Sequence, residues 1–532
     1  MRTCNTLGSI RQPKPVSPVL SLPTPVPTVR TPRIQPNRRD LLKGASALSL
    51  AATVGRGEGR PNILVIMVDQ HRHDLAGYAG SGYATTPYLD ALAAESVRIE
   101  SCYAAVPLCA PARQSFVTGQ YASTHGTFRN RHAEVDGERT VFHDITSGGY
   151  HTGWFGKTHC NVSGFGQVQS QDQLLAAHVE KYPGSLPAGA ERIITDQPTA
   201  VPFMEPYNTR YEDPGTNHPF HMEEHVTRQT LGALKQRPKD KPFLMVASFL
   251  SPHPPLFPPK DFLELYRDAD LPMPSDRMMR KLDLPSDLDR RRRTTRMLRV
   301  SEPMARNATR AYYASLAWTD HCMGQLLAGL EQQKLSDSTL VIYTSDHGDT
   351  LGEHGIFGKR SFFEAASRVH LMVRQPGVLP QGVVRERVAS HLDLTASLMS
   401  WTGTKNAHNL PGRPLQALLA GDPDLAWKDE ARMELTRSVG LPKDGELTLA
   451  PGDAPPAAGY WCLRRGDWKY SDFGGGQRYL FDLKTDPSER LNRIDDGTTQ
   501  DMADEMAASL HQGSPKTWAF HRTESGQEGA PK

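Results

Sequence analysis

Three largely apolar runs constrain the fold more than any other feature of this sequence. They span residues 63–68, 241–250 and 340–344, and polar residues follow each run directly. Apolar runs of this length are typical of parallel strands that are buried on both faces of a sheet. Ligand sites in such sheets lie beyond the carboxyl ends of the strands. Asp69, which follows the first run, is therefore a candidate site residue, with a turn or a helix cap as the alternative role for a lone aspartate at this place.

The spacing of these runs along 532 residues predicts an α/β fold with a small appendage. We expect residues 60–424 to form a large, mostly parallel sheet sandwiched by helices. From about residue 425 the pattern changes to short alternating segments, including 459–464 and 479–483, which are typical of antiparallel strands. Residues 425–532 are therefore expected to form a small C-terminal antiparallel-sheet subdomain and a tail.

The first 59 residues have the composition of a leader segment. Residues 11–36 are rich in proline, which favours an extended, disordered chain. Arg38 and Arg39 then precede a short, mildly apolar run over residues 44–54, and this arrangement resembles a twin-arginine export signal. It predicts a periplasmic or secreted protein that uses the twin-arginine export machinery. The alternative is a disordered basic arm.

Charge and hydropathy exclude several other classes of function. Lys and Arg total 61 against 59 Asp and Glu, with no separate basic stripe, so we expect no nucleic-acid partner. No later run is long and apolar enough to span a bilayer, so an integral membrane protein is not expected. The run from Arg290 to Arg293 is interpreted as a solvated surface insertion, with an anion-recruiting patch as the alternative. The six cysteines are widely spaced and predict no complete disulfide framework.

Cys109 stands at a point where the chain can begin a helix. Pro111 is suited to the first helical position, and Phe116 and Tyr121 continue the expected helix. A helix N-terminus offers free N–H groups and a dipole that favour a bound anion. Arg113 would lie one turn into this helix, close to Cys109. The alternative is a plain buried cysteine that serves only the core.

Five motifs occur in one order along the chain. They are Cys109-Ala-Pro-Ala-Arg113, the stretch GYHTGWFGKTH at 149–159, PHP at 252–254, SDHGD at 345–349, and YLFDLKTDPSERLN at 479–492. In this order they resemble the type I, formylglycine-dependent sulfatases of the alkaline phosphatase superfamily. The resemblance runs from about residue 62 to residue 492. It implies that the protein is a sulfuric ester hydrolase, similar to the arylsulfatases.

The resemblance assigns roles to the polar residues of these motifs. A formylglycine-generating maturation enzyme would oxidise Cys109 to formylglycine, whose hydrate attacks the sulfate ester to form a covalent sulfo-enzyme. Lys157 and Lys359 would neutralise the sulfate oxygens. His253 would protonate the departing alcohol, and His159 would take the proton that regenerates the aldehyde. The implied catalytic residues are therefore Cys109, Arg113, Lys157, His159, His253 and Lys359.

The same resemblance implies one divalent metal. Its ligands would be Asp69, Gln70, Asp346 and His347, and oxygen-rich ligation favours Ca²⁺ or Mg²⁺. Many sulfatases have Asp and Asn where this chain has Gln70 and His347. The two substitutions leave only two carboxylates, and the imidazole admits Mn²⁺ as well.

Three functions are consistent with these motifs. The first is hydrolysis of a small-molecule or carbohydrate sulfate ester to alcohol and sulfate. The second is a phosphonate monoester or phosphodiester hydrolase, because the pair of Gln70 and His347 also resembles that group of relatives. Lys157 and His159 favour the first over the second. The third, an inactive protein that binds sulfated glycans, would require a missing nucleophile or ligand, and none is missing.

Overall fold

A computed structural model describes most of the chain after residue 59. The described residues are 60–130, 139–174, 222–272, 284–436 and 459–512, without residues 255, 257, 295–296, 298–299 and 406–407. They belong to one compact unit, Gly55–Lys532. The predicted export signal around Arg38 and Arg39 lies outside the described residues. The domain boundary expected near residue 425 stays a prediction.

The three apolar runs form the centre of the sheet. Strand β1 (Asn62–Val68) lies between β5 (Phe243–Phe249) and β6 (Thr339–Ser345), and all three are parallel. Val68 is in register with Phe249 on one side and Ser345 on the other. The carboxyl ends of the three strands therefore meet at one edge, as the sequence predicts.

Six more strands widen this sheet. Strands β3 (His151–Gly156) and β4 (Gln167–Ser170) continue it in parallel beyond β5. On the other side, β8 (Leu371–Arg374) pairs antiparallel with both β6 and β2 (Val97–Tyr103). The order is β4-β3-β5-β1-β6-β8-β2-β7, and β9 also pairs with β2. Strand β7 spans Arg368–Val369 and β9 spans Val383–Ser390.

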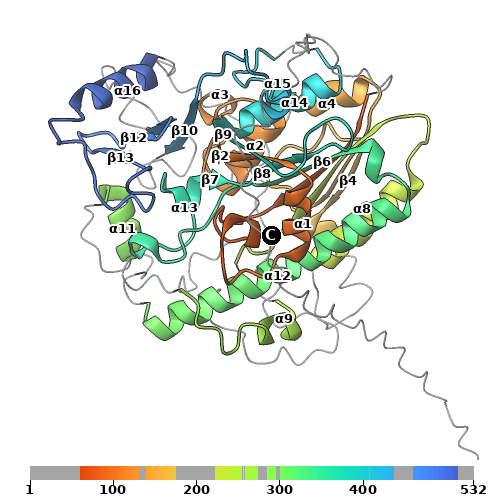
Figure 1. The fold of residues 1–532 in the computed structure, drawn as a ribbon, viewed down its shortest axis with the longest axis horizontal. Helices are drawn as coiled ribbons and strands as arrows, with labels where there is room; N and C mark the ends of the chain where they lie inside the picture. Colours follow the sequence, from red (N-terminus) through yellow and green to blue (C-terminus); the bar gives the residue numbers. More distant parts are fainter. Residues whose placement is uncertain are drawn as a thin grey trace, which may run out of the picture. The chain divides into compact units, whose positions relative to one another are not determined.

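Helices cover both faces of this sheet (Figure 1). Side chains alternate between the faces along β1, so Leu64 and Ile66 pack with α1, α8 and α12, whereas Ile63 and Val65 pack with α2, α4 and α14. The longer helices are α1 (Pro87–Ala94), α2 (Cys109–Thr118), α8 (Met222–Gln236), α11 (Ser286–Thr294), α12 (Glu302–Gln332), α14 (His391–Trp401) and α16 (Gln500–Gln512). The shorter ones are α3 (Ala122–His125), α4 (Val141–Ser147), α9 (Lys260–Glu264), α13 (Glu364–Ser367) and α15 (Gln416–Ala420). The 3-10 helices among the described residues are η1 (Gly77–Ala79), η4 (Ser336–Ser338) and η5 (Glu353–Gly355).

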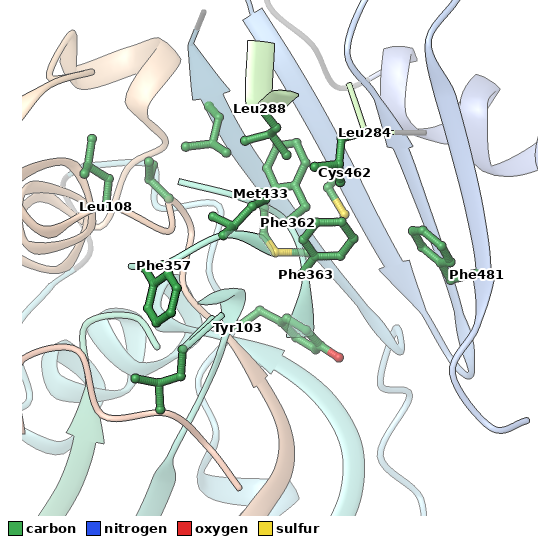
Figure 2. Close-up of a cluster of buried hydrophobic side chains, with 14 of the residues drawn as sticks. Tyr103, Leu108, Leu284, Leu288, Phe357, Phe362, Phe363, Met433, Cys462 and Phe481 are labelled. Carbon is green, nitrogen blue, oxygen red and sulfur yellow. The ribbon is translucent and has the colours of Figure 1, made fainter. Parts of the chain in front are cut away.

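A second sheet follows near the C-terminus, as predicted. Its four antiparallel strands are β10 (Glu430–Thr436), β11 (Gly459–Arg465), β12 (Trp468–Asp472) and β13 (Arg478–Asp482). Its inner face shares a core with the large sheet, and Figure 2 shows Met433, Cys462 and Phe481 facing Tyr103 and Phe363. None of the helices in the described part of the chain is long and apolar enough to cross a membrane.

Candidate active site

Cys109 occupies the first position of helix α2 and is fully buried. The helix begins two residues earlier than predicted, because Leu108 is extended and its carbonyl accepts the first helical hydrogen bond from Ala112 N–H. Pro111 is therefore the third helical residue rather than the first. The N-terminal placement of Cys109 itself agrees with the prediction.

Several nitrogen-bearing side chains converge on the Cys109 sulfur. Lys359 Nζ lies 2.9 Å from Sγ, His347 Nε2 lies 3.2 Å away, and Lys157 Nζ lies 3.5 Å away. The same sulfur acts to raise the pKa of His159 and of His253, so both rings lie near it. Burial acts to raise the pKa of the Cys109 thiol, but the neighbouring charges, of which Lys157 and Lys359 contribute most, hold it well below its ordinary value. The position is thus built to stabilise negative charge.

Arg113 joins the two aspartates that follow strands β1 and β6. Its Nη2 donates to Asp69 Oδ2 at 3.0 Å, and its Nε donates to Asp346 Oδ2 at 2.8 Å. Its Nη1 donates to Ser248 Oγ at 2.8 Å and to the Lys157 carbonyl at 3.0 Å. The sequence places Arg113 next to Cys109, and the structure adds that its guanidinium is shared between both carboxylates.

The remaining donor atoms of this cluster fit a metal ion. One ligand atom each from Asp69, Cys109, Asp346 and His347 lies within 4.8 Å of the others, and all four residues are buried. Arg113 donates to the Oδ2 atoms of both aspartates. Their other oxygens lie near His347 Nε2, with Asp346 Oδ1 at 3.6 Å and Asp69 Oδ1 at 3.9 Å. Two carboxylate oxygens and an imidazole nitrogen therefore face one point, which suits a divalent cation.

The two carboxylates differ in their electrostatic surroundings. Burial and the Cys109 sulfur act to raise the pKa of Asp69, but the charges of Lys157, His253 and Arg113 outweigh them and hold it well below its ordinary value. Lys157 Nζ lies 2.5 Å from Asp69 Oδ2. Burial and the charge of Asp69 raise the pKa of Asp346 to about 6. A bound cation would favour the charged form of both groups.

Gln70 lies beside these carboxylates with its side chain turned toward the loop that carries Lys359. Its Nε2 donates to Asp349 Oδ2 at 2.5 Å, and its Oε1 accepts from Lys359 Nζ at 2.7 Å. The backbone φ of Gln70 is 65°, a left-handed conformation that few residues other than glycine adopt. The structure thus brings all four residues predicted as metal ligands to one place.

Lys157 reaches the site through a close backbone approach at the end of β3. Gly156 has a φ of 101°, and a Cβ at this position would lie 2.1 Å from the Ser248 carbonyl oxygen. That same oxygen accepts the Lys157 N–H at 3.0 Å. Glycine is therefore required at the residue that turns the chain into the site.

The two predicted proton-transfer histidines flank the cluster. His253 Nδ1 pairs with the Pro254 carbonyl, and its Nε2 lies 4.0 Å from Asp69 Oδ1. Burial and the charges of Lys157 and Lys359 lower the pKa of His253 to about 4. Burial and Lys157 also lower the pKa of His159, whose Nδ1 is buried without a hydrogen-bond partner among the described residues. Burial and the neighbouring ammonium groups therefore favour the neutral form of both rings.

Sequence reasoning missed four residues that contribute to this site, on three segments of the chain. Ser248 accepts from Arg113, and its position inside an otherwise apolar run was a usable signal. Asp349 lies within the quoted SDHGD motif, but no role was assigned to it. The interpretation of the arginine run as solvated surface is wrong for Arg291 and Arg292, because both donate to backbone carbonyls of the loop that carries Lys359.

Comparisons with known proteins agree with this fold and site. The model of the Sulfatase family matches residues 61–404. The arylsulfatase of Clostridium perfringens is 28% identical over 461 residues, which are 82% of this chain and 90% of the relative. The choline-sulfatase of Rhizobium meliloti is 29% identical over 472 residues, which are 82% of each chain.

A solved structure gives the same result for the fold. The phosphonate monoester hydrolase of Agrobacterium radiobacter superimposes with a TM-score of 0.68 at 22% identity, over 85% of this chain and 95% of that one. Fold and site together define an enzyme of the alkaline phosphatase superfamily. Within that superfamily, the chain belongs to the sulfatase family and is a hydrolase of sulfate esters.

Proposed function

We propose that this enzyme hydrolyses a sulfate monoester to an alcohol and sulfate at formylglycine derived from Cys109, with one divalent metal. The observation that carries the proposal is the convergence of Lys157, Lys359 and His347 on the Cys109 sulfur at a helix N-terminus. A hydrated aldehyde at this position would supply the nucleophilic oxygen that attacks sulfur. Buried cations aimed at one point stabilise the charge of a sulfate group far better than water-exposed ones.

The metal would be held by Asp69, Gln70, Asp346 and His347. When bound, it would orient the sulfate and favour the ionised form of the nucleophile. The two carboxylates and the amide favour Ca²⁺ or Mg²⁺, and the His347 imidazole admits Mn²⁺. Arg113 holds Oδ2 of both aspartates, and Asp346 Oδ1 also accepts the N–H groups of Gln70 and His347, so Asp69 Oδ1 is the carboxylate oxygen most open to the cation.

Protons would move at two ring nitrogens. The Nδ1 atom of His253 donates to the Pro254 carbonyl, so only the imidazolium form, which carries a second proton at Nε2, would deliver a proton to the departing alcohol oxygen. On the other side of the nucleophile, His159 contacts the Cys109 side chain and would take a proton from it. The Lys157 and Lys359 ammonium groups would meanwhile neutralise the sulfate oxygens.

The substrate proposed is a small-molecule or carbohydrate sulfate ester. Relatives of this chain include enzymes named for aryl and choline sulfate esters. A phosphonate monoester hydrolase is the second candidate, because Gln70 and His347 resemble that group and its structure is similar overall. Export through the twin-arginine machinery to the periplasm or beyond is part of the proposal, on the basis of Arg38 and Arg39.

The proposed function is tested by mass spectrometry and turnover on the same preparation. Peptide mass spectrometry across Cys109 should find the aldehyde or its hydrate in protein from a host that contains the maturation enzyme. That preparation should hydrolyse an aryl sulfate faster than the matching aryl phosphonate monoester. Cys109→Ala should lose turnover of both esters, whereas Cys322→Ala, another buried cysteine on α12, should keep it.

Two results would count against this assignment. An active preparation with an unmodified Cys109 thiol would refute the formylglycine chemistry. A faster rate on the phosphonate ester would instead favour the second candidate function.

A further inference from the structure

Asp349 connects the two segments that carry Gln70 and Lys359. Its side chain is fully buried. Its Oδ1 accepts from the backbone N–H groups of Leu351 and Gly358, both at 2.8 Å, and its Oδ2 accepts from Gln70 Nε2 at 2.5 Å. Gly358 immediately precedes Lys359. The Asp349 carboxylate therefore connects the loop that carries Lys359 to Gln70, which lies just beyond the end of strand β1.

The two ends of the Gln70 amide face groups of opposite chemistry. A carboxylate can only accept hydrogen bonds, so Asp349 must face the NH₂ group of the amide. An ammonium group can only donate, so Lys359 must face the amide oxygen, 2.7 Å from its Nζ. The same ammonium lies 2.9 Å from the Cys109 sulfur. Asp349 therefore turns the Gln70 amide oxygen toward the Lys359 ammonium, which itself lies beside the Cys109 sulfur.

The backbone of Gln70 is held just as firmly as its side chain. Its N–H donates to Asp346 Oδ1 at 3.0 Å, and its carbonyl accepts from the Tyr312 hydroxyl at 2.5 Å. The same hydroxyl accepts from Arg72 N–H at 3.0 Å. These bonds fix residue 70 in its left-handed conformation, so the hydrogen-bond partners of the amide decide which of its atoms faces the site.

We propose that Asp349 is a positioning residue for the site: it presents the Gln70 amide oxygen to the metal and to Lys359. This inference rests on the proposed metal-dependent function. It also explains why an amide stands at position 70. A carboxylate there would meet the Asp349 carboxylate in a buried, low-dielectric place, where two like charges repel strongly. Gln70 and Asp349 are therefore a matched pair, and the negative charge can stand at one position or the other, but not at both.

The test moves the negative charge from position 349 to position 70 in the full chain. Calorimetric titration then measures the affinity of each variant for Ca²⁺ and for Mn²⁺. Asp349→Asn should weaken the binding of both ions about tenfold, because outer partners of ligands contribute on this scale. Gln70→Glu should weaken it at least as much. The double variant Gln70→Glu with Asp349→Asn restores an NH₂ group opposite a carboxylate and should bind both ions better than either single variant. Its urea midpoint should likewise exceed that of both single variants.

A matched control separates this role from the general effect of a buried aspartate. Asp320 is buried and accepts from the N–H groups of Leu89 and Tyr88 on helix α1, remote in sequence from the metal ligands. Asp320→Asn should change the urea midpoint and leave ion affinity unchanged. If Asp349 serves only its own loop, the losses of the two single variants add in the double variant, and the proposal is overturned.

The remaining outcomes are also decisive. Wild-type affinity in Asp349→Asn would overturn the positioning role and leave the proposed function intact. If wild type binds neither ion, the proposed metal site fails, and this inference fails with it. Should Asp349→Asn not fold, a folded double variant that binds the ions supports the matched pair, whereas an unfolded double variant refutes it.

Discussion

At the scale of single residues, the charge of Arg113 stabilises two carboxylates, Asp69 and Asp346, that are buried side by side. Its guanidinium is fully buried and spans Asp69, Asp346 and Ser248 at once. A lysine carries the same charge, but it is a point charge on a flexible stem and cannot span three acceptors in fixed directions. Arg113→Lys is therefore expected to lower the free energy of unfolding by about 3 kcal/mol, since it leaves a buried carboxylate without its partner.

Urea unfolding at neutral pH measures this loss. Arg139→Lys provides the control, because Arg139 is 62% exposed and pairs with Asp144 at the surface. That change should stay within about 0.5 kcal/mol of wild type. Equal free energies of unfolding for the two variants would show that the guanidinium geometry of Arg113 adds no stability beyond its charge.

At the scale of elements, helix α11 supports the loop that carries Lys359. Arg291 donates to the carbonyls of Lys359 and Phe357, whereas Arg293 on the same helix is 65% exposed and pairs with Asp289. Loss of the first contact frees the backbone that positions the Lys359 ammonium. A misplacement of about 1 Å can cost up to 100-fold in rate.

We therefore expect Arg291→Ala to lower kcat/KM on an aryl sulfate about tenfold, with most of the loss in kcat. Arg293→Ala should stay within about twofold of wild type. Steady-state kinetics on both variants, with urea midpoints measured alongside, gives the comparison. Equal losses in the two variants would mean that α11 acts through its charge and that its contact with the loop is unimportant.

At the scale of the whole molecule, the two sheets are joined by polar as well as apolar contacts. Lys469 on β12 is fully buried and pairs with Glu364 of α13 at 2.9 Å and with Glu489 at 2.6 Å. Glu489 lies in the C-terminal motif that contributed to the recognition of the family, and its Oε2 also accepts from Glu364 N–H. The motif therefore anchors the small sheet close to the loop that carries Lys359.

Global stability also depends on buried histidines that must stay neutral. His125 pairs with Thr127 N–H through Nδ1 and with Ser115 Oγ through Nε2, and burial lowers its pKa from 6.5 to about 3. Between these values the unfolded chain binds a proton that the native state does not. The contribution of His125 is thus fully present above pH 6.5 and is lost, at about 1.4 kcal/mol per pH unit, as the pH falls toward 3.

Without the His125 imidazole, unfolding below pH 6.5 should take up one proton fewer. We expect His125→Gln to have a flatter decline in the free energy of unfolding between pH 6 and pH 4.5 than wild type, whatever its absolute stability. Above pH 7 the two slopes should coincide. Urea titrations at several pH values measure both ranges, and parallel curves throughout would contradict a neutral buried His125.

Much of the fold and most of the site were accessible from sequence. The apolar runs predicted parallel strands, and β1, β5 and β6 confirm them. The residues that end these strands, together with the Cys109, Lys157, His253 and Lys359 motifs, do come together around one sulfur. Strand ends are predictable because side-chain periodicity and a break in hydropathy are local properties. The start of α2 was misplaced, because cap position depends on the preceding residue, here an extended Leu108.

By itself, the sequence determined the family, the central strands and the identity of the groups in the site, because each is written in a local pattern or motif. The tertiary structure alone decided how those groups are connected. Gln70 and Asp349, or Arg291 and Lys359, stand far apart in the chain, and their contacts depend on how several elements pack at once. Nothing in a local pattern records which acceptor a buried arginine or amide will meet, since every such partner is selected by the need to satisfy buried polar groups in the folded interior.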